Sequence, residues 1–592
     1  MSFFKTFLAV ILGLFTTAFL LTMILIGIVA SSSTETEPYI RTGTVLNIPV
    51  FGVVSERAAA DPFAEIFDSG ASDRVTMDRF RSVMRKAKAD ERIAGIRLDL
   101  SYAGGSFTHL TEMRDLLIDF KSTGKFIYAY IDDRGANEAG YFIATAADSI
   151  FAQPETYLEL DGFYIQSPFF SNTLERYGLE MEVINTGSYK TAAATFIEDE
   201  FSASDREQLQ AIMQGYTDVF VQAASEFTGH ETSRVNEILN SQPNILIQHA
   251  LDNGFVHGLM FESEFEDFLS ERTDNSSLRD VDFGRYNRVS NAKAGVETPG
   301  RNAKEIAVVF AEGPIMPDVG GSIFDEGGTI HFNKMRETID DLVEDDNVAA
   351  IVVRVNSPGG AVTTSEAIKN LFEQASQVKP LMVSMGPVAA SGGYYIAMGA
   401  DSVFAEANTI TGSIGVILTK LSYGKALEEN FGVTHDEIRS HTNADWFSPV
   451  NTLTAEQRNG LQNIADITYQ NFLELVAEAR GTTADAIHPI AQGRVWTGQT
   501  ALELGLVDGI GALPDVIVVA AERAGVEEFT VGHYPAPENF LESLMASGNA
   551  QIHAVTRHIF GVQPAMNTLL RDIHRMNRPQ VFSILDTDFS VN

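Results

Sequence analysis

The sequence contains no cysteine, and this absence removes several classes of chemistry at once. Within its 592 residues, disulfides, thiolate metal sites and cysteine nucleophiles are excluded. Positive charge is also scarce: 42 lysines and arginines stand against 79 aspartates and glutamates, which gives a net charge of -37. This charge argues against nucleic acid as a partner, because phosphate binding favours a basic surface. We interpret the excess of acid as a solvated surface.

The chain has one long hydrophobic run and lacks a second. Residues 7–30 are uncharged and mostly apolar, and as a helix they would extend about 36 Å, enough to cross a hydrocarbon core of about 30 Å. Lys5 precedes the run, which favours a cytoplasmic N-terminus and an exported remainder. A cleaved signal peptide is the alternative, but its apolar core is usually about 7–15 residues long. We therefore expect residues 1–33 to be a retained transmembrane anchor.

The length is too great for one ordinary domain, and an internal repeat accounts for it. Three pairs of segments match in the same order and at nearly constant separation, which indicates two copies of one fold. The pairs are 92–100 with 347–355, 141–152 with 394–405, and 250–258 with 501–509. We expect a first copy at 43–265, a linker at 266–304, a second copy at 305–525 and a C-terminal tail at 526–592. The tail contains a helix candidate at 566–576 without an assigned role.

Within each copy, segments typical of strands and of helices alternate. In the second copy the expected strands are 307–310, 349–355 and 381–385, and the expected helices are 332–343 and 365–375. Such alternation predicts an α/β fold in which helices cover a parallel sheet. Ligands of these sheets bind at the carboxyl ends of the strands, where this sequence has Gly-rich turns.

Ser391 stands at a strand-to-helix junction of the second copy, followed by two glycines. A helix N-terminus offers free N–H groups and partial positive charge. An oxyanion formed beside Ser391 would be held by the amide of Gly392 and by that of Gly359 or Gly360. The alternative is that Ser391 is only a helix N-cap. The first copy has Glu138 at the matching position, so only the second copy can supply this nucleophile.

A serine nucleophile needs a base, and Lys190 is the candidate. It lies in the segment 187–196, which is rich in small and apolar residues, while the second copy has no lysine in the matching region. The role requires that burial lower the lysine pKa from about 10.4 to near neutral; the alternative is an ordinary exposed lysine. We interpret the histidines as surface or core residues, in particular His435, His441 and His488.

These residues resemble the signal peptide peptidase A (protease IV) family in its long, duplicated form. The similarity covers almost the whole chain, and four segments carry it: Gly187 to Lys190, Asn356 to Gly360, Ala390 to Tyr395 and Gly493 to Gly498. The resemblance implies two tandem Clp-protease/crotonase-like domains and a Ser/Lys dyad of Ser391 and Lys190. It also implies that Ser413 hydrogen-bonds the lysine, at a position where the first copy has Leu160. No metal and no cofactor are expected.

The resemblance further implies an endopeptidase that degrades cleaved signal peptides. It would be held by residues 7–30 in a bacterial inner membrane, with the catalytic domains on the periplasmic side, and would assemble as a homotetramer. One departure from the family's pattern is visible: the lysine motif is often followed by an acidic residue, proline and phenylalanine, whereas Ala194-Thr195-Phe196 stands here.

Two alternatives of other classes remain at this point. One is a crotonase-type enzyme acting on acyl-CoA thioesters, which export would contradict because CoA chemistry is cytosolic. The other is a non-catalytic membrane-bound scaffold that kept the fold. CoA binding would support the first, and failure of Ser391 to react with a serine-directed phosphonate or β-lactone would support the second.

Overall fold

The structure is a computed structural model that describes residues 13, 16–17, 37–57, 75–241, 245–318, 328–535 and 582–584. The expected anchor at 7–30 lies outside the described residues apart from residues 13, 16 and 17, and so does the helix candidate at 566–576. In these described ranges, no helix combines the length and the apolar character that crossing a membrane requires.

The first repeat is built on a parallel six-stranded sheet in the order β8-β4-β3-β2-β1-β9. Apolar side chains with little exposure fill its core. The strands are β1 (Thr44–Val54), β2 (Ile93–Gly105), β3 (Phe126–Ile131), β4 (Ser149–Ala152), β8 (Gly258–Leu259) and β9 (Asp280–Asp282). The main helices are α3 (Met77–Ala89), α4 (Phe107–Lys121), α5 (Glu138–Ala144), α8 (Ala203–Thr228), α9 (Thr232–Leu239), α10 (Ile247–Asp252), α11 (Glu262–Arg272) and α12 (Phe283–Asn287).

The second repeat contains an eight-stranded sheet whose main path is β17-β15-β13-β11-β10-β19. Its strands are β10 (Lys304–Glu312), β11 (Val348–Ser357), β13 (Leu381–Ala390), β14 (Ser402–Ala405), β15 (Ile410–Gly412), β17 (Val495–Thr497), β18 (Gly509–Ile510) and β19 (Phe529–Tyr534). Its helices include α13 (Phe332–Glu344), α14 (Val362–Ser376), α15 (Gly392–Ala397), α17 (Ala455–Ala479), α18 (Ala484–Ile487), α19 (Gly498–Glu503) and α20 (Leu513–Ala524). The strands and helices expected in this copy are confirmed.

The local sequence explains these elements. β11 is rich in valine, isoleucine and alanine, with Arg354 among them, and is largely buried on both faces, as a central parallel strand must be. α13 places Met335, Ile339 and Leu342 on one buried face, which is the spacing of an amphipathic helix. The duplicated pattern therefore produces two sheets of the same kind.

Each sheet gains an edge strand from the segment that follows its repeat. β9 lies in the segment expected to be a linker and pairs with β1, while β19 lies in the expected tail and pairs with β10. The duplication thus continues past the sequence matches from which it was inferred.

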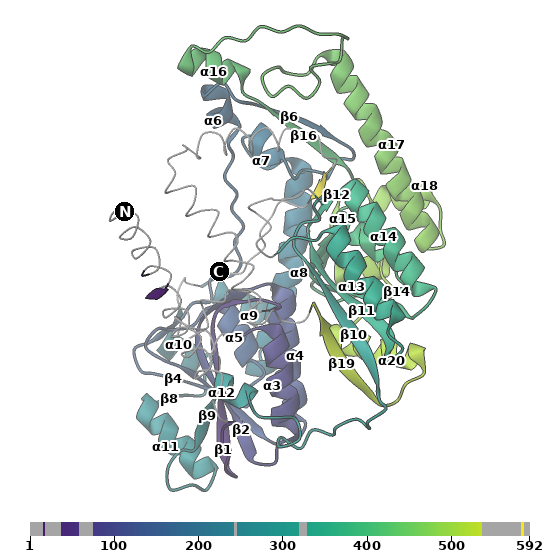
Figure 1. The fold of residues 1–592 in the computed structure, drawn as a ribbon. Coiled ribbons are helices and arrows are strands. Elements are labelled where there is room, and N and C mark those ends of the chain that lie inside the picture. The colour runs from purple at the N-terminus through teal and green to yellow at the C-terminus, as the bar shows by residue number, and fades with distance from the viewer. Residues whose placement is uncertain are drawn as a thin grey trace, which may run out of the picture.

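A further sheet joins the two repeats. Its order is β12 (Gly359–Ala361), β20 (Phe582–Ile584), β16 (Ile417–Ser422) and β6 (Glu180–Asn185). β6 of the first repeat runs antiparallel to β16 of the second, from Asn185 opposite Ile417 to Glu180 opposite Ser422. Figure 1 shows this pair at the top of the molecule, above the two sheets.

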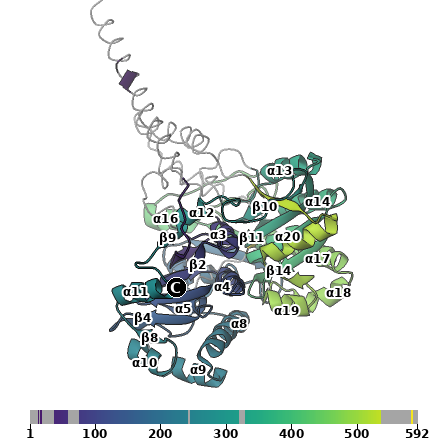
Figure 2. The ribbon, with the colours of Figure 1, turned by 90° about the horizontal axis from the view of Figure 1, so that it is seen from below.

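The two repeats also share a buried seam. Ile410 and Val495 of the second repeat belong to the same buried apolar cluster as the core of the first. Seen from below, α4 and α8 lie on the side of the first repeat that faces the second (Figure 2). The two halves therefore fold against each other over a continuous core.

Candidate active site

Ser391 lies between β13 and α15 in a backbone conformation that is uncommon for a residue with a side chain. Its φ is 58° and its ψ is -116°. Such strained positions cluster at functional sites. Ser391 occupies the N-cap position of α15, but its side chain makes no capping hydrogen bond to the helix. The Ser391 N–H donates to the Gly412 carbonyl at 2.8 Å, which fixes the turn that presents the hydroxyl.

Lys190 reaches this hydroxyl from the other repeat. It follows β6, and its Nζ lies 2.6 Å from Ser391 Oγ, within the same chain. Its side chain is only 1% exposed despite the altered sequence after the lysine motif. Burial lowers the pKa of Lys190 to about 7. The amine is therefore largely neutral slightly above neutral pH, as proton abstraction requires.

Ser413 also contacts the lysine amine. Lys190 Nζ lies 3.0 Å from Ser413 Oγ and 3.0 Å from the Ser413 carbonyl oxygen. Ser413 also has a positive φ, of 51°, and its N–H donates to the Arg494 carbonyl at 2.7 Å. Two acceptors and the Ser391 hydroxyl thus surround the amine.

The candidate oxyanion glycines lie side by side. A Cβ placed on Gly392 would fall 3.0 Å from the Gly360 nitrogen and 3.1 Å from the Gly359 Cα. The Gly359 N–H donates to Ser357 Oγ at 3.2 Å. This bond favours Gly360 over Gly359 as the partner of Gly392. A Cβ on Gly360 would lie 2.0 Å from the Ile315 carbonyl oxygen, so this close approach requires glycine.

The segment after Gln492 supports Lys190 from behind. A Cβ on Gly493 would lie 2.5 Å from the Lys190 Cβ, so only glycine fits there. The Arg494 guanidinium stacks on Tyr189 and on Trp496, with its Cζ 4.9 Å and 4.2 Å from the two ring centroids. The sequence identified this motif but assigned no role to its individual residues.

The first copy fills its own matching site with a carboxyl group. Glu138 Oε1 accepts hydrogen bonds from the N–H groups of Asp161 and Gly162 at 2.6 Å and 2.8 Å. Burial raises the pKa of Glu138 to about 7. By the repeat match, Gly162 corresponds to Gly415, beside which the Lys190 side chain lies in the second copy. The three histidines considered above as alternative bases, His435, His441 and His488, are exposed, whereas Ser391 is buried.

The short strand β20 of the C-terminal tail lies in the sheet beside the glycines. It pairs antiparallel with Gly359–Ala361 on one side, and Phe582 pairs with Ile417 of β16 on the other. An extended strand therefore fits between β12 and β16. Sequence reasoning had assigned no role to this tail.

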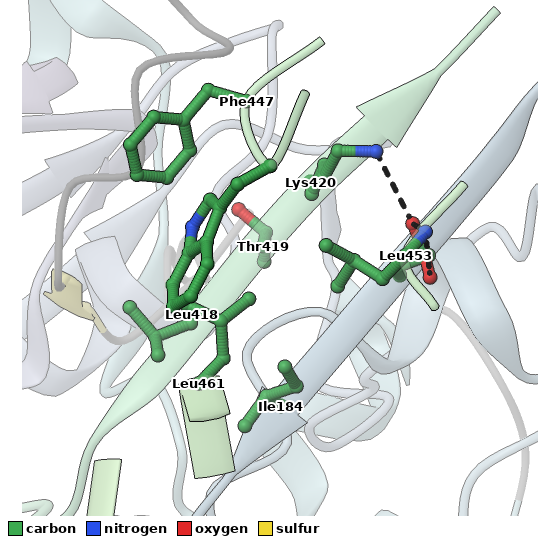
Figure 3. Close-up of a pocket in the computed structure, with 9 residues that line it drawn as sticks. Ile184, Leu418, Thr419, Lys420, Phe447, Leu453 and Leu461 are labelled. Atoms are coloured by element: carbon green, nitrogen blue, oxygen red, sulfur yellow. Dashed lines mark hydrogen bonds and ion pairs between the residues drawn. The ribbon is translucent and has the colours of Figure 1, made fainter. Parts of the chain in front are cut away.

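A separate pocket lies on the β6–β16 pair (Figure 3). It contains an ion pair, with Lys420 Nζ 3.4 Å from Glu182 Oε2. Neither Ser391 nor Lys190 lines it, so it is not the catalytic centre. Its lining consists of Glu182, Ile184, Leu418, Thr419, Lys420, Trp446, Phe447, Leu453 and Leu461.

Comparison with known proteins gives a consistent result. The model of peptidase family S49 matches the chain twice, over residues 119–273 and 373–527. The chloroplastic serine protease SPPA of Arabidopsis thaliana is 29% identical over 530 residues, which cover 88% of this chain and 76% of that protein. Protease 4 of Salmonella typhi is 30% identical over 486 residues, which cover 80% of this chain and 76% of that protein.

Among solved structures, a mutant of ClpP1 from Listeria monocytogenes shares 16% identity. The match covers 36% of this chain and 94% of that chain, with a TM-score of 0.24. The structure contains two tandem domains with α/β sheets, and their Clp-protease/crotonase-like character stays a prediction.

Proposed function

The chain belongs to peptidase family S49 and is a serine peptidase, and from this premise we propose that Ser391 is its nucleophile and Lys190 its general base. The observation that carries the proposal is the 2.6 Å distance between Lys190 Nζ and Ser391 Oγ. The membership favours a peptidase over the acyl-CoA enzyme and over the non-catalytic scaffold.

The proposed reaction proceeds through an acyl-enzyme. Neutral Lys190 accepts the hydroxyl proton of Ser391 as Oγ attacks the peptide carbonyl carbon. The ammonium then gives this proton to the leaving amine as the C–N bond breaks. Water, deprotonated by Lys190, attacks the ester, and the acid product leaves while Ser391 regains its proton. Ser413 supports the proposal because its two oxygens orient the lysine amine toward Ser391.

Backbone amides supply the electrostatic part of the mechanism. We assign the oxyanion hole to the N–H groups of Gly392 and Gly360, with Gly359 shaping the turn. Their adjacency beside Ser391 supports this assignment. One such donor is typically worth about 3 kcal/mol of transition-state stabilisation.

The substrates we propose are extended apolar peptides, of which cleaved signal peptides are one class. The pairing of β20 with β12 and β16 supports this, because a substrate strand would make the same backbone hydrogen bonds. A folded protein does not present such a strand. No residue of the proposed mechanism requires a metal or a cofactor.

We further propose a membrane-bound, oligomeric enzyme. The apolar run at 7–30 supports a single-pass anchor in a bacterial inner membrane, with the catalytic domains on the periplasmic side. Exposed apolar side chains near α16 (Gly424–Phe431) support assembly into an oligomer, for which the family resemblance implies a homotetramer. They are Phe431, Val433, Ile438 and Phe447.

Peptide hydrolysis by three variants tests the proposed dyad. We expect Ser391→Ala and Lys190→Ala to lose at least about 10³-fold in kcat, because nucleophile and base act as a unit. Lys86→Met is the matched control: Lys86 is also a buried lysine, but its Nζ contacts the backbone carbonyls of Asn287 and Val289. Full activity of folded Lys190→Ala at neutral pH would contradict the proposal.

A further inference from the structure

A cluster of charged side chains is buried where the two repeats meet. The first repeat contributes residues that follow β1 or lie on α3 and α4, and the second contributes residues of β11 and of the end of β14. Arg81 is the most exposed, at 13% of its side chain, and Arg354 is completely buried. The members are Glu56, Arg81, His109, Glu112, Arg354 and Glu406.

Arg354 connects carboxylates of both repeats. Its Nε donates to Glu56 Oε2 of the first repeat at 3.2 Å, and its Nη2 donates to Glu406 Oε1 of the second at 2.9 Å. The Nη2 also lies 3.8 Å from Glu112 Oε2 of the first repeat. A single guanidinium of β11 thus reaches across the seam.

The same guanidinium holds the two strands that lead to the catalytic centre. Its Nη1 donates to Ser384 Oγ and to the Met385 carbonyl, both at 3.0 Å and both on β13. β13 ends immediately before Ser391, and β11 runs into the turn that carries Gly359 and Gly360. Arg354 therefore couples the strands of the nucleophile and of the glycines to the first repeat.

The carboxyl groups of the cluster respond differently to burial and to its two guanidinium groups. Arg81 forms a two-pronged pair with Glu112, at 2.5 Å and 2.7 Å. Burial disfavours ionisation of Glu56, but Arg354 and Arg81 outweigh it and hold the pKa of this carboxyl well below its usual range. Burial, and then the neighbouring Glu112, raise the pKa of Glu406 to about 8, so Glu406 holds a proton. Removing Arg354 would leave buried negative charge at the seam.

We propose that Arg354 is a positioning residue that fixes the register of the two repeats and thereby the contact between Lys190 and Ser391. The inference rests on the proposed dyad, whose members come from opposite sides of this seam. Arg354 does not touch either of them; it acts through β11, β13 and the first repeat.

The test measures catalysis per active site in Arg354→Met and Arg354→Lys. Titration with a serine-directed phosphonate gives the concentration of reactive sites. Misfolded protein is therefore not mistaken for a lower kcat. For Arg354→Met we expect kcat per site to fall about 10- to 100-fold, because small displacements of reacting groups have effects of this size. We expect KM to change less than about twofold. The pKa of the acidic limb of kcat/KM should rise above about 7 as water reaches Lys190.

Arg354→Lys keeps the charge but not the fork of donors, and we expect it to recover part of the rate. Glu56→Gln should lower kcat per site, as Arg354→Lys does. The variant that carries both substitutions should lose less than the product of the two single losses in kcat, since both substitutions remove the same contact between Arg354 and Glu56. These two variants decide the matter if Arg354→Met does not fold. Arg97→Met is the control, because Arg97 is a buried guanidinium paired with Asp99 and Glu262 of its own repeat.

Unchanged kcat per site and an unchanged pH profile in Arg354→Lys and Glu56→Gln would overturn the inference. An equal fall in kcat per site in Arg97→Met would also overturn the inference, because loss of any buried ion pair would then have the same effect. Failure of the proposed dyad is distinguishable: Ser391→Ala or Lys190→Ala would then retain activity in the parental protein.

Discussion

At the scale of single residues, the two halves of the duplication place different side chains at matching positions, Ser391 in the second copy and Glu138 in the first. In the second copy, Ser391 and Ser413 both adopt positive φ and both lie beside the Lys190 amine. In the first copy, the Glu138 carboxyl accepts hydrogen bonds from two backbone N–H groups, both of the first repeat. The reacting groups therefore exist once, although their scaffold exists twice.

Glu138 gives a prediction about stability. Its folded-state pKa of about 7 lies above the ordinary value of 4.5, so the folded state holds the proton longer than the unfolded state. Stability contributed by this group is complete below about pH 4.5 and is lost as the pH rises to about 7, by at most about 3 kcal/mol. We expect Glu138→Gln to remove this loss without lowering peptidase activity.

Urea unfolding at several pH values between 4 and 8 measures this effect. The difference in unfolding free energy between Glu138→Gln and the parent should increase in favour of the variant as the pH rises. Parallel pH dependences for the two proteins would contradict the assignment.

At the scale of elements, the sequence predicted what depends on local pattern. The runs that became β10, β11 and β13 are mostly apolar on both faces, and the α13 pattern has a clear helical period. The edge strands β9 and β19 were not predicted because they are half exposed and carry no such pattern. The pairing of β6 with β16 joins residues more than 200 positions apart, which no local pattern encodes.

The site divides in the same way. Ser391 and Lys190 were predicted because the duplication showed which residues each copy lacks, and the glycines because they form a turn directly after a buried strand. Arg354 was not found because its partners lie far away in the sequence, and an arginine in a buried strand carries no sign of which carboxylates surround it.

The short strand β20 gives a prediction at this scale. Because it pairs with both β12 and β16, it takes the place that we propose for a substrate strand. Deleting residues 536–592 should therefore raise kcat/KM for a short peptide, by a few-fold to about tenfold. Ser583→Pro should act in the same direction in the full chain, since proline cannot donate to a ladder hydrogen bond.

Steady-state hydrolysis of a fluorogenic peptide by the three proteins provides the measurement. The deletion and the point variant should agree, because both remove the same pairing. An unchanged or lower kcat/KM in both would show that β20 does not compete with substrate.

At the scale of the whole molecule, the proposed dyad depends on the seam between the repeats. Lys190, the proposed base, follows β6, and Ser391, the proposed nucleophile, follows β13. The inter-repeat sheet and the Arg354 cluster connect the two repeats. Neither half holds both reacting groups. Duplication in one polypeptide ensures that the halves are always present in equal amount.

A mixing experiment follows from the dyad lying within one chain. Ser391→Ala and Lys190→Ala subunits, produced together so that they assemble jointly, should show no more activity than either variant alone. Restoration of about a quarter or more of the parental activity would indicate that the lysine serves a neighbouring chain. Co-purification of two differently tagged variants is the control for joint assembly.

The proposed activation of Ser391 by neutral Lys190 is tested most directly by the rate at which a phosphonate modifies Ser391, followed by mass spectrometry across pH 5 to 9. The pKa of Lys190 is about 7, below its ordinary 10.5, so the neutral base appears as the pH rises through this value. We predict that the parental rate rises with an inflection near pH 7, and that Lys190→Ala is slower by at least about 10³-fold and lacks the inflection. Modification of Lys190→Ala at the parental rate, with the same inflection, would contradict the central claim.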